Sequence, residues 1–329
     1  MRACVISEFG TADVLEIRDV PPPVPGDGEV LVRVQATALN RADLLQRSGR
    51  YAPPAGVPPD IPGIEFAGSV EAVGPGASLW QPGDRVFAIV GGGAHAEFVV
   101  AHEATLVRIP ERLDWIDAAA IPEAFITAHD ALISQASLRE NEIALVHAVG
   151  SGVGLAGAQI AAAWGAHVFG TSRTQAKLDR ARGFGMHEGV ALSTDLSPLG
   201  SALHAWSDGR GADVVLDLLG GPYLGASIEV AALRGRIMLV GAIAGSSTTI
   251  DVRRVLSRRL TLRGTVLRAR GLEEKIEVAR AFSRDLLPLL ASGALVATVD
   301  SVFPLDAIRD AHRRMESNGT FGKVVVQVA

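Results

Sequence analysis

A glycine-rich turn is the segment of this sequence whose residue types point most directly to chemistry. Residues 143–154 read IALVHAVGSGVG, an apolar strand followed by a turn that opens an alanine-rich helix. Glycines let the backbone turn tightly, and a pyrophosphate can then approach the free N–H groups at the start of the helix. The third glycine of a strict G-x-G-x-x-G pattern falls at Leu155. An ordinary strand–helix connection is the alternative, but the flanking strand and helix favour a dinucleotide site made by Gly150, Ser151, Gly152, Val153 and Gly154.

The residues that follow the next strand select between two dinucleotides. Enzymes that bind NAD place an Asp or Glu on the ribose 2′-hydroxyl, about 20 residues beyond the glycine turn. This sequence has Ser172 and Arg173 there, with Lys177 one helical turn later, and no carboxylate. A guanidinium can hold a phosphate through two parallel N–H bonds, and an ammonium adds a point charge. The pattern predicts a 2′-phosphate site and therefore NADPH, although Arg173 and Lys177 could also be solvated charges on a helix face.

The composition limits the classes of protein to which the chain can belong. Its 329 residues favour two domains, and a net charge of −5 argues against nucleic acid as a main partner. The single cysteine, Cys4, excludes an internal disulfide framework and fits a reducing, cytoplasmic compartment. The N-terminus reaches Glu8 too early for the apolar core of a signal peptide.

A long run without charged residues lies between Glu142 and Arg173. A membrane-spanning helix needs about 20 strongly apolar residues in one element. Here glycines interrupt the run repeatedly, and His147 and His167 lie within it. The run therefore predicts a strand, a helix and a second strand of a buried core, and no membrane partner.

Two rhythms of secondary structure divide the chain. The first third is rich in short strands bounded by Gly and Pro, which predicts a barrel-like antiparallel domain. From about residue 122 strands and helices alternate, which predicts a parallel, doubly wound sheet. We expect strands at 30–36, 68–74, 84–88, 94–100, 143–147, 167–171, 214–217, 236–240 and 323–328, and helices at 152–164, 175–184, 273–291 and 305–317. Gly185 is expected to end the second of these helices in a left-handed cap.

Several further segments together resemble one protein family. They are Ala38–Leu44, Arg47–Pro54, Ala118–Ala124, His147-Ala148 with Ser151–Gly154, and Gly322-Lys323. In this order they resemble the zinc-independent quinone oxidoreductases of the medium-chain dehydrogenase/reductase superfamily. The similarity is greater to the tumour-suppressor-inducible NADPH quinone oxidoreductase group than to zeta-crystallin. It implies an α/β protein with a GroES-like catalytic domain (1–122 and 268–329), a Rossmann domain (123–267), and NADPH in the cleft between them.

The resemblance also implies roles for individual residues. Asn40 and Tyr51 match positions near the nicotinamide, Thr127 matches a threonine near the cofactor, and Ser172 and Lys177 match the 2′-phosphate site. The close relatives do not generally carry Arg173. Gly241 and Lys323 complete the expected cofactor contacts. Asp43 also matches, but an Asp at this position can equally cap a helix.

The same resemblance predicts that no metal is bound. In alcohol dehydrogenases of the superfamily, a Cys and a Gly-His-Glu segment hold the catalytic zinc, which needs three protein ligands. The corresponding positions here carry Asn40 and, in the segment Pro62-Gly63-Ile64-Glu65, Ile64. Without a metal, alcohol oxidation lacks its Lewis acid.

The expected reaction is hydride transfer from NADPH to a conjugated carbonyl compound such as a quinone. Tyr51 is the favoured donor to the carbonyl oxygen and Asn40 a second candidate, although Tyr51 could only line the pocket and Asn40 only hold a loop. Loops 51–57 and 266–270 are expected to form the pocket. We also expect a homodimer formed through an edge strand at 260–266, because an unpaired edge of that length would favour association.

Two other functions stay open at this point. One is an NADPH-dependent reductase of enones or enoyl thioesters, which would need a basic surface for coenzyme A. An arginine cluster could supply that surface, but a solvated face is the favoured interpretation of Arg253, Arg254, Arg258, Arg259 and Arg263. The other is a non-catalytic NADPH-binding protein, for which binding without turnover would be the sign.

Overall fold

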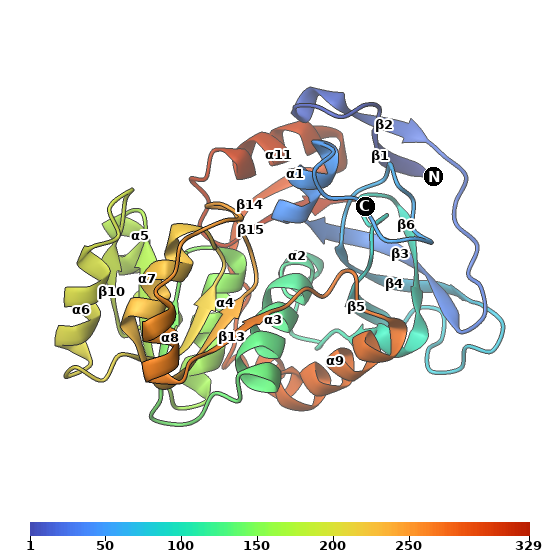
Figure 1. The fold of residues 1–329 in the computed structure, drawn as a ribbon. Helices are drawn as coiled ribbons and strands as arrows, with labels where there is room; N and C mark the ends of the chain where they lie inside the picture. The colour runs from blue at the N-terminus through green and yellow to red at the C-terminus, as the bar shows by residue number, and fades with distance from the viewer. The chain divides into compact units, whose positions relative to one another are not determined.

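The computed structural model describes all 329 residues, which form two compact units. One unit comprises residues 1–126 and 267–329, and the other comprises residues 127–266. These divisions lie four residues after and one residue before the boundaries expected from the sequence. We call them the β-rich unit and the parallel-sheet unit (Figure 1). The mixed α/β class is confirmed.

The β-rich unit is built on a seven-stranded sheet with the order β14-β15-β3-β4-β5-β7, in which β6 also pairs with β3. All pairs are antiparallel except β14 with β15. The strands are β3 (Glu29–Ala38), β4 (Glu65–Val73), β5 (Arg85–Ile89), β6 (Phe98–His102), β7 (Val107–Arg108), β14 (Val299–Pro304) and β15 (Lys323–Gln327). A separate hairpin pairs β1 (Arg2–Ile6) with β2 (Leu15–Asp19).

One strand of this unit begins later than expected. The sequence predicted a strand at 94–100, but β6 begins at Phe98. The preceding residues are a loop whose backbone bonds to another loop: Gly93, Ala94 and His95 donate to the carbonyls of Ile61, Gly63 and Pro62. These bonds hold residues 93–95 to segment 61–63, so their backbone N–H groups cannot pair with a strand of the sheet.

The β-rich unit also contains five helices. They are α1 (Arg41–Arg47), α2 (Trp115–Ala119), α9 (Leu272–Asp285), α10 (Leu287–Ser292) and α11 (Ile308–Glu316), with short 3-10 turns at Ala12–Val14, Glu103–Thr105 and Leu305–Ala307. The prediction of a single helix at 273–291 is wrong, because this segment divides into α9 and α10. Pro288, in the first turn of α10, has no N–H to continue the earlier helix.

The parallel-sheet unit has six parallel strands in the order β10-β9-β8-β11-β12-β13. They are β8 (Ile143–Val146), β9 (His167–Ser172), β10 (Glu188–Ala191), β11 (Ala212–Asp217), β12 (Ala231–Leu239) and β13 (Thr261–Gly264). The chain moves outward from β8 to β10, returns to β11, and then moves outward on the other side. The doubly wound sheet is therefore confirmed, with its switch point between β8 and β11. Ligands bind such sheets beyond the carboxyl ends of the strands at this point.

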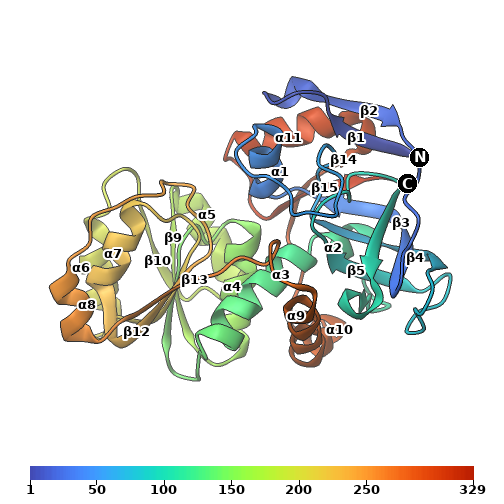
Figure 2. The same cartoon turned by 45° about the vertical axis from the view of Figure 1, so that its right-hand side comes forward.

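Helices lie on both faces of this sheet, as right-handed crossovers require. Figure 2 shows α4 and α5 on one side and α6, α7 and α8 on the other. These are α4 (Gly152–Ala163), α5 (Gln175–Ala181), α6 (Pro198–Trp206), α7 (Pro222–Val230) and α8 (Val252–Arg258). A π-helix spans Asp130–Gln135, and α3 (Pro122–His129) crosses the boundary between the units.

The expected elements around the uncharged run are present. Residues 143–172 form β8, the glycine turn, α4 and β9, and no helix of the structure has the length and apolar character needed to cross a bilayer. After α5 the chain makes one 3-10 turn (Arg182–Phe184). Gly185 ends this turn with a left-handed φ of 86°, so the predicted cap is confirmed.

Candidate functional site

The glycine turn lies at the carboxyl end of β8, at the switch point of the parallel sheet. Ser151 caps α4, and its Oγ accepts a hydrogen bond from the Gly154 N–H at 3.1 Å. A side chain at Gly154 would meet the Ala148 carbonyl oxygen at 2.4 Å, so only glycine fits. The first turn of α4 therefore presents backbone N–H groups and the positive end of a twelve-residue helix to this edge of the sheet. This arrangement suits a pyrophosphate.

His147 anchors the start of the glycine turn through its side chain, a role that the sequence analysis did not identify. Its ring is fully buried, with Nδ1 at 2.9 Å from Thr171 Oγ1 and Nε2 at 2.9 Å from Ser227 Oγ. The Tyr223 ring packs edge-on against it, with centroids 5.1 Å apart. Burial lowers the pKa of His147 to about 4, opposed by the charge of Asp217. A neutral imidazole therefore joins β8, β9 and α7 beneath the turn.

The residues expected at the 2′-phosphate lie at the next strand end. Ser172 ends β9 and is largely buried, Arg173 follows it on the surface, and Lys177 lies in α5, half-buried. Burial raises the pKa of Tyr223, and the positive charge of Arg173 opposes this shift. One hydroxyl and two cations thus gather beyond the carboxyl end of β9.

Two other expected cofactor residues also belong to the parallel-sheet unit. Gly241 follows β12, where a side chain would meet the Leu218 carbonyl oxygen at 2.5 Å, so close packing requires glycine there. Thr127 is buried in α3. The remaining expected residues, Asn40, Tyr51 and Lys323, belong to the β-rich unit.

In the β-rich unit Asn40, Glu65 and Lys323 form a buried ionic network. Lys323 Nζ lies 2.7 Å from Glu65 Oε1, and it donates to Asn40 Oδ1 at 2.6 Å and to the Leu39 carbonyl at 2.8 Å. Asn40 Nδ2 donates to Glu65 Oε1 at 2.8 Å. The backbone N–H of Glu123 donates to Glu65 Oε2 at 2.8 Å. The carboxylate is fully buried, and burial raises its pKa although Lys323 and these hydrogen bonds oppose the shift.

Asp43 serves to hold backbone. Its Oδ2 accepts from the Asn40 N–H at 2.7 Å, at the start of α1, and its Oδ1 accepts from the Gly63 N–H at 2.9 Å. The helix-capping interpretation of this residue is therefore confirmed. Ile64, where the resemblance to alcohol dehydrogenases places a zinc-ligating histidine, is buried, and no three His, Cys, Asp or Glu side chains lie close enough to hold a metal ion.

Tyr51 lies against a buried arginine. The guanidinium carbon of Arg268 is 5.0 Å from the centroid of the Tyr51 ring. Arg268 Nε donates to the Gly91 carbonyl at 2.7 Å, and Nη2 donates to Gln46 Oε1 at 2.6 Å. The structure thus brings together residues of the two predicted pocket loops. It adds a third loop, Gly91–Gly93, which the sequence analysis missed although three successive glycines mark it.

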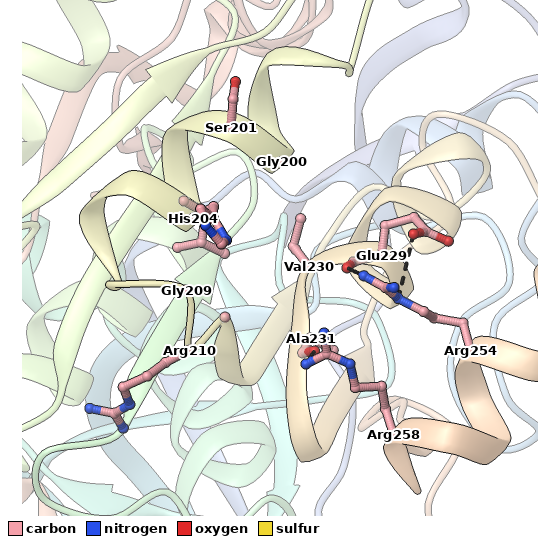
Figure 3. Close-up of a pocket in the computed structure, with 12 residues that line it drawn as sticks. Gly200, Ser201, His204, Gly209, Arg210, Glu229, Val230, Ala231, Arg254 and Arg258 are labelled. Carbon is pink, nitrogen blue, oxygen red and sulfur yellow. Dashed lines mark hydrogen bonds and ion pairs between the residues drawn. The ribbon is translucent and has the colours of Figure 1, made fainter.

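A separate cavity of about 410 Å³ lies at the opposite, amino-terminal edge of the parallel sheet, where β11 and β12 begin (Figure 3). Arg254 donates to the Glu229 carbonyl at 2.5 Å and pairs with the Glu229 carboxylate, and Arg258 donates to the Ala231 carbonyl at 3.4 Å. These arginines of the basic cluster therefore bind the C-terminal end of α7. The cavity is remote from the glycine turn.

Comparison with known proteins agrees with both units. Residues 26–111 match the family "Alcohol dehydrogenase GroES-like domain", and residues 152–284 match "Zinc-binding dehydrogenase". The human protein named quinone oxidoreductase is 32% identical over 330 aligned residues, covering 99% of this chain and 97% of that protein.

Solved structures show the same similarity over the whole chain. Mycobacterial Rv1454c complexed with NADPH has a TM-score of 0.88 and 29% identity and covers 100% of both chains. The apo form of JamJ enoyl reductase has a TM-score of 0.85 and 27% identity, covering 100% of this chain and 99% of that one. The chain belongs to the quinone oxidoreductase branch of the medium-chain dehydrogenase/reductase superfamily.

Proposed function

We propose that this protein is an enzyme that uses NADPH to reduce quinones or other conjugated carbonyl compounds without zinc. The observation that carries the proposal is the group of Ser172, Arg173 and Lys177 beside the glycine turn, with no carboxylate at the position that recognises NAD. The similarity to quinone oxidoreductases and to an NADPH-bound structure supports it.

The parallel-sheet unit binds the cofactor. NADPH, when bound, supplies the hydride. The N–H groups of the first turn of α4 bind the pyrophosphate, and the close packing at Gly154 keeps that approach open. Ser172, Arg173 and Lys177 bind the 2′-phosphate through a hydroxyl and two cations. Thr127 and Gly241 line the remaining cofactor surface.

In the β-rich unit Tyr51 and Asn40 take different parts. Tyr51 presents a phenol O–H that can donate to the acceptor. The Asn40 amide is committed, since Nδ2 donates to Glu65 and Oδ1 accepts from Lys323. All three visible partners of the Lys323 ammonium are likewise protein oxygens. We therefore assign Asn40 and Lys323 to holding this part of the β-rich unit in place rather than to proton donation.

The same network supports the proposal that the enzyme works without zinc. The carboxylate of Glu65 is paired with an ammonium, and Asn40 and Ile64 supply neither a thiolate nor an imidazole. Elemental analysis of the purified protein should find no stoichiometric zinc, and a chelator should leave NADPH oxidation unchanged. Stoichiometric zinc whose removal abolishes activity would contradict the proposal.

The second candidate is reduction of a conjugated alkene, because an enoyl reductase shares the fold over the whole chain. The arginine cluster that could have received coenzyme A gives it little support, since Arg254 and Arg258 bind α7. The third candidate, a non-catalytic NADPH-binding protein, predicts NADPH binding with no oxidation by any acceptor.

Edge strand β13 supports a homodimer. It forms the last strand of the parallel sheet, and the side chains of Val252 and Leu256 on α8, which precedes it, are 59% and 70% exposed. Pairing β13 with its copy would cover an open row of backbone groups. Light scattering should give twice the mass of the chain.

The single buried Cys4 fits a cytoplasmic setting.

The test of the proposed function is a substrate panel with matched cofactors. Oxidation of NADPH and of NADH is followed with 1,4-benzoquinone, an α,β-unsaturated ketone and crotonyl-coenzyme A. We expect the highest kcat/KM with the quinone and a strong preference for NADPH. Turnover confined to the thioester would favour the second candidate, and a preference for NADH would overturn the cofactor assignment.

A further inference from the structure

Arg268 is a buried cation that the proposed function has not yet used. Its side chain lies in the turn between β13 and α9, and the residue is only 5% exposed. Nε and Nη2 donate to the Gly91 carbonyl and to the Gln46 side chain. Nη1 is also buried and has no hydrogen-bond partner. Since donors of buried charged groups are rarely left without an acceptor, Nη1 indicates a place for a ligand oxygen.

The Arg268 guanidinium lies beside an aromatic ring and a glycine loop. The guanidinium lies over the Tyr51 ring, and cation–π attraction holds the two planes together. Loop Gly91–Gly93 approaches closely, because a side chain at Gly92 would lie 3.7 Å from Arg268 Nη2 and one at Gly91 would lie 2.9 Å from Val57. All these residues belong to the β-rich unit, so the arrangement exists within one compact unit.

The charge of Arg268 is not neutralised by direct contact. Its two hydrogen bonds go to a carbonyl and an amide oxygen, which are both neutral. Both oxygens of the nearby Asp43 accept from backbone N–H groups. Burial lowers the pKa of Arg268, and the electrostatic influence of the nearby Asp43, Tyr51 and Glu123 opposes this shift. An arginine keeps its proton in proteins, so a cation faces this position at neutral pH.

We propose that Arg268 donates from Nη1 to the acceptor oxygen that becomes negative during reduction, and that this selects acceptors whose reduced form is a phenolate-like oxyanion. This inference rests on the proposed function. The quinone receives the hydride with its electron pair from the nicotinamide and becomes a hydroquinone monoanion, and a proton from water then completes the hydroquinone. Arg268 stabilises the anion before that proton arrives, because its donor is already oriented and desolvated.

The test uses 4-nitrophenol, a non-reacting mimic of the anion whose phenolate form is coloured. It is titrated into the enzyme with saturating NADP⁺, and absorbance across a pH series gives the apparent pKa of the bound ligand. The wild type should bind the phenolate, with an apparent pKa below that of the free ligand. In Arg268→Met that pKa should rise by about one unit, equivalent to roughly tenfold weaker binding of the phenolate over the phenol.

Two further variants separate charge from structure. Arg268→Gln keeps a planar N–H donor without the charge, and should resemble Arg268→Met if charge is what matters. Arg280→Met removes an exposed arginine from α9 of the same unit and should behave as the wild type. In steady-state assays Arg268→Met should lower kcat/KM for the quinone roughly 10–100-fold while the KM for NADPH is unchanged.

Two results would overturn the assignment. One is an unchanged apparent pKa of bound 4-nitrophenol in both folded Arg268 variants. The other is a raised KM for NADPH with unaltered phenolate binding, which would assign Nη1 to the cofactor. If the wild type reduces no quinone yet binds the phenolate in an Arg268-dependent manner, the proposed function fails and the oxyanion site stands.

Discussion

Replacing Lys323 by Met tests the buried ionic network directly. The change removes the ammonium that pairs with Glu65 at 2.7 Å and leaves a fully buried carboxylate. Glu65 then keeps only the hydrogen bonds from Asn40 and from the Glu123 N–H. Removing one partner of a buried ion pair costs about 3–5 kcal/mol, because the remaining charge is uncompensated. We expect the β-rich unit of Lys323→Met to be destabilised by that amount at neutral pH.

The double variant Glu65→Gln/Lys323→Met separates the charge from the packing. Without the carboxylate no buried anion remains, so most of the stability should return, with a coupling energy of about 2–3 kcal/mol. The loss in the single variant should also shrink as the pH falls. Loss of Lys323 raises the pKa of Glu65 further above its unfolded value, so the folded protein binds the proton first and is stabilised relative to neutral pH.

Differential scanning calorimetry and urea unfolding at several pH values provide the measurement. Two units can unfold separately, so the transition of the β-rich unit must be identified, for which NADPH is useful because it protects the other unit most directly. A loss below about 1 kcal/mol in Lys323→Met, or additive effects in the double variant, would refute the view that Lys323 neutralises Glu65.

Three other predictions follow from the cofactor and acceptor residues. Arg173→Ala/Lys177→Ala should raise the KM for NADPH far more than that for NADH in steady-state assays. Equal increases in the two KM values would contradict the 2′-phosphate assignment. Tyr51→Phe should lower kcat for quinones if the phenol donates, whereas unchanged turnover would leave Tyr51 only a packing role. The pKa of His147 is about 4 in the folded protein and about 6.5 in the unfolded chain. The free energy of unfolding of the wild type should therefore fall by roughly 3 kcal/mol as the pH falls from about 6.5 to about 4. Urea titrations of His147→Gln should lack this pH-dependent loss.

Local sequence was sufficient to predict the elements that carry the residues proposed to bind the cofactor. The strand, the glycine turn and α4 are consecutive, and Ser172 and Lys177 follow the next strand at a short distance. The chemistry of such a segment depends on neighbours along the chain, so its pattern can be interpreted without knowing the tertiary structure. The cap at Gly185 was predicted for the same reason, whereas the edge position of β13 was predicted from family resemblance.

The residues of the β-rich unit that we propose for the acceptor are brought together by contacts that no local sequence pattern shows. Asn40 and Lys323 are 283 residues apart in the sequence, and Arg268 and Gln46 are 222 apart. The sequence analysis named Lys323 only through family resemblance, and it placed Arg268 within a pocket loop without predicting its contacts. Its single long helix over 273–291 failed because helical periodicity outweighed the one residue, Pro288, that interrupts it.

The position of Lys323 also bears on how the chain is synthesised. Strand β15, which carries Lys323, joins the sheet between β14 and β3, although β3 is made some 280 residues earlier. While the ribosome is still producing the intervening segment, Glu65 has no cation and β3 lacks one of its neighbours. The parallel-sheet unit is continuous in sequence and can form first. The β-rich unit must wait for its closing strand, so we expect it to be the part of the nascent protein most exposed to chaperones and proteases.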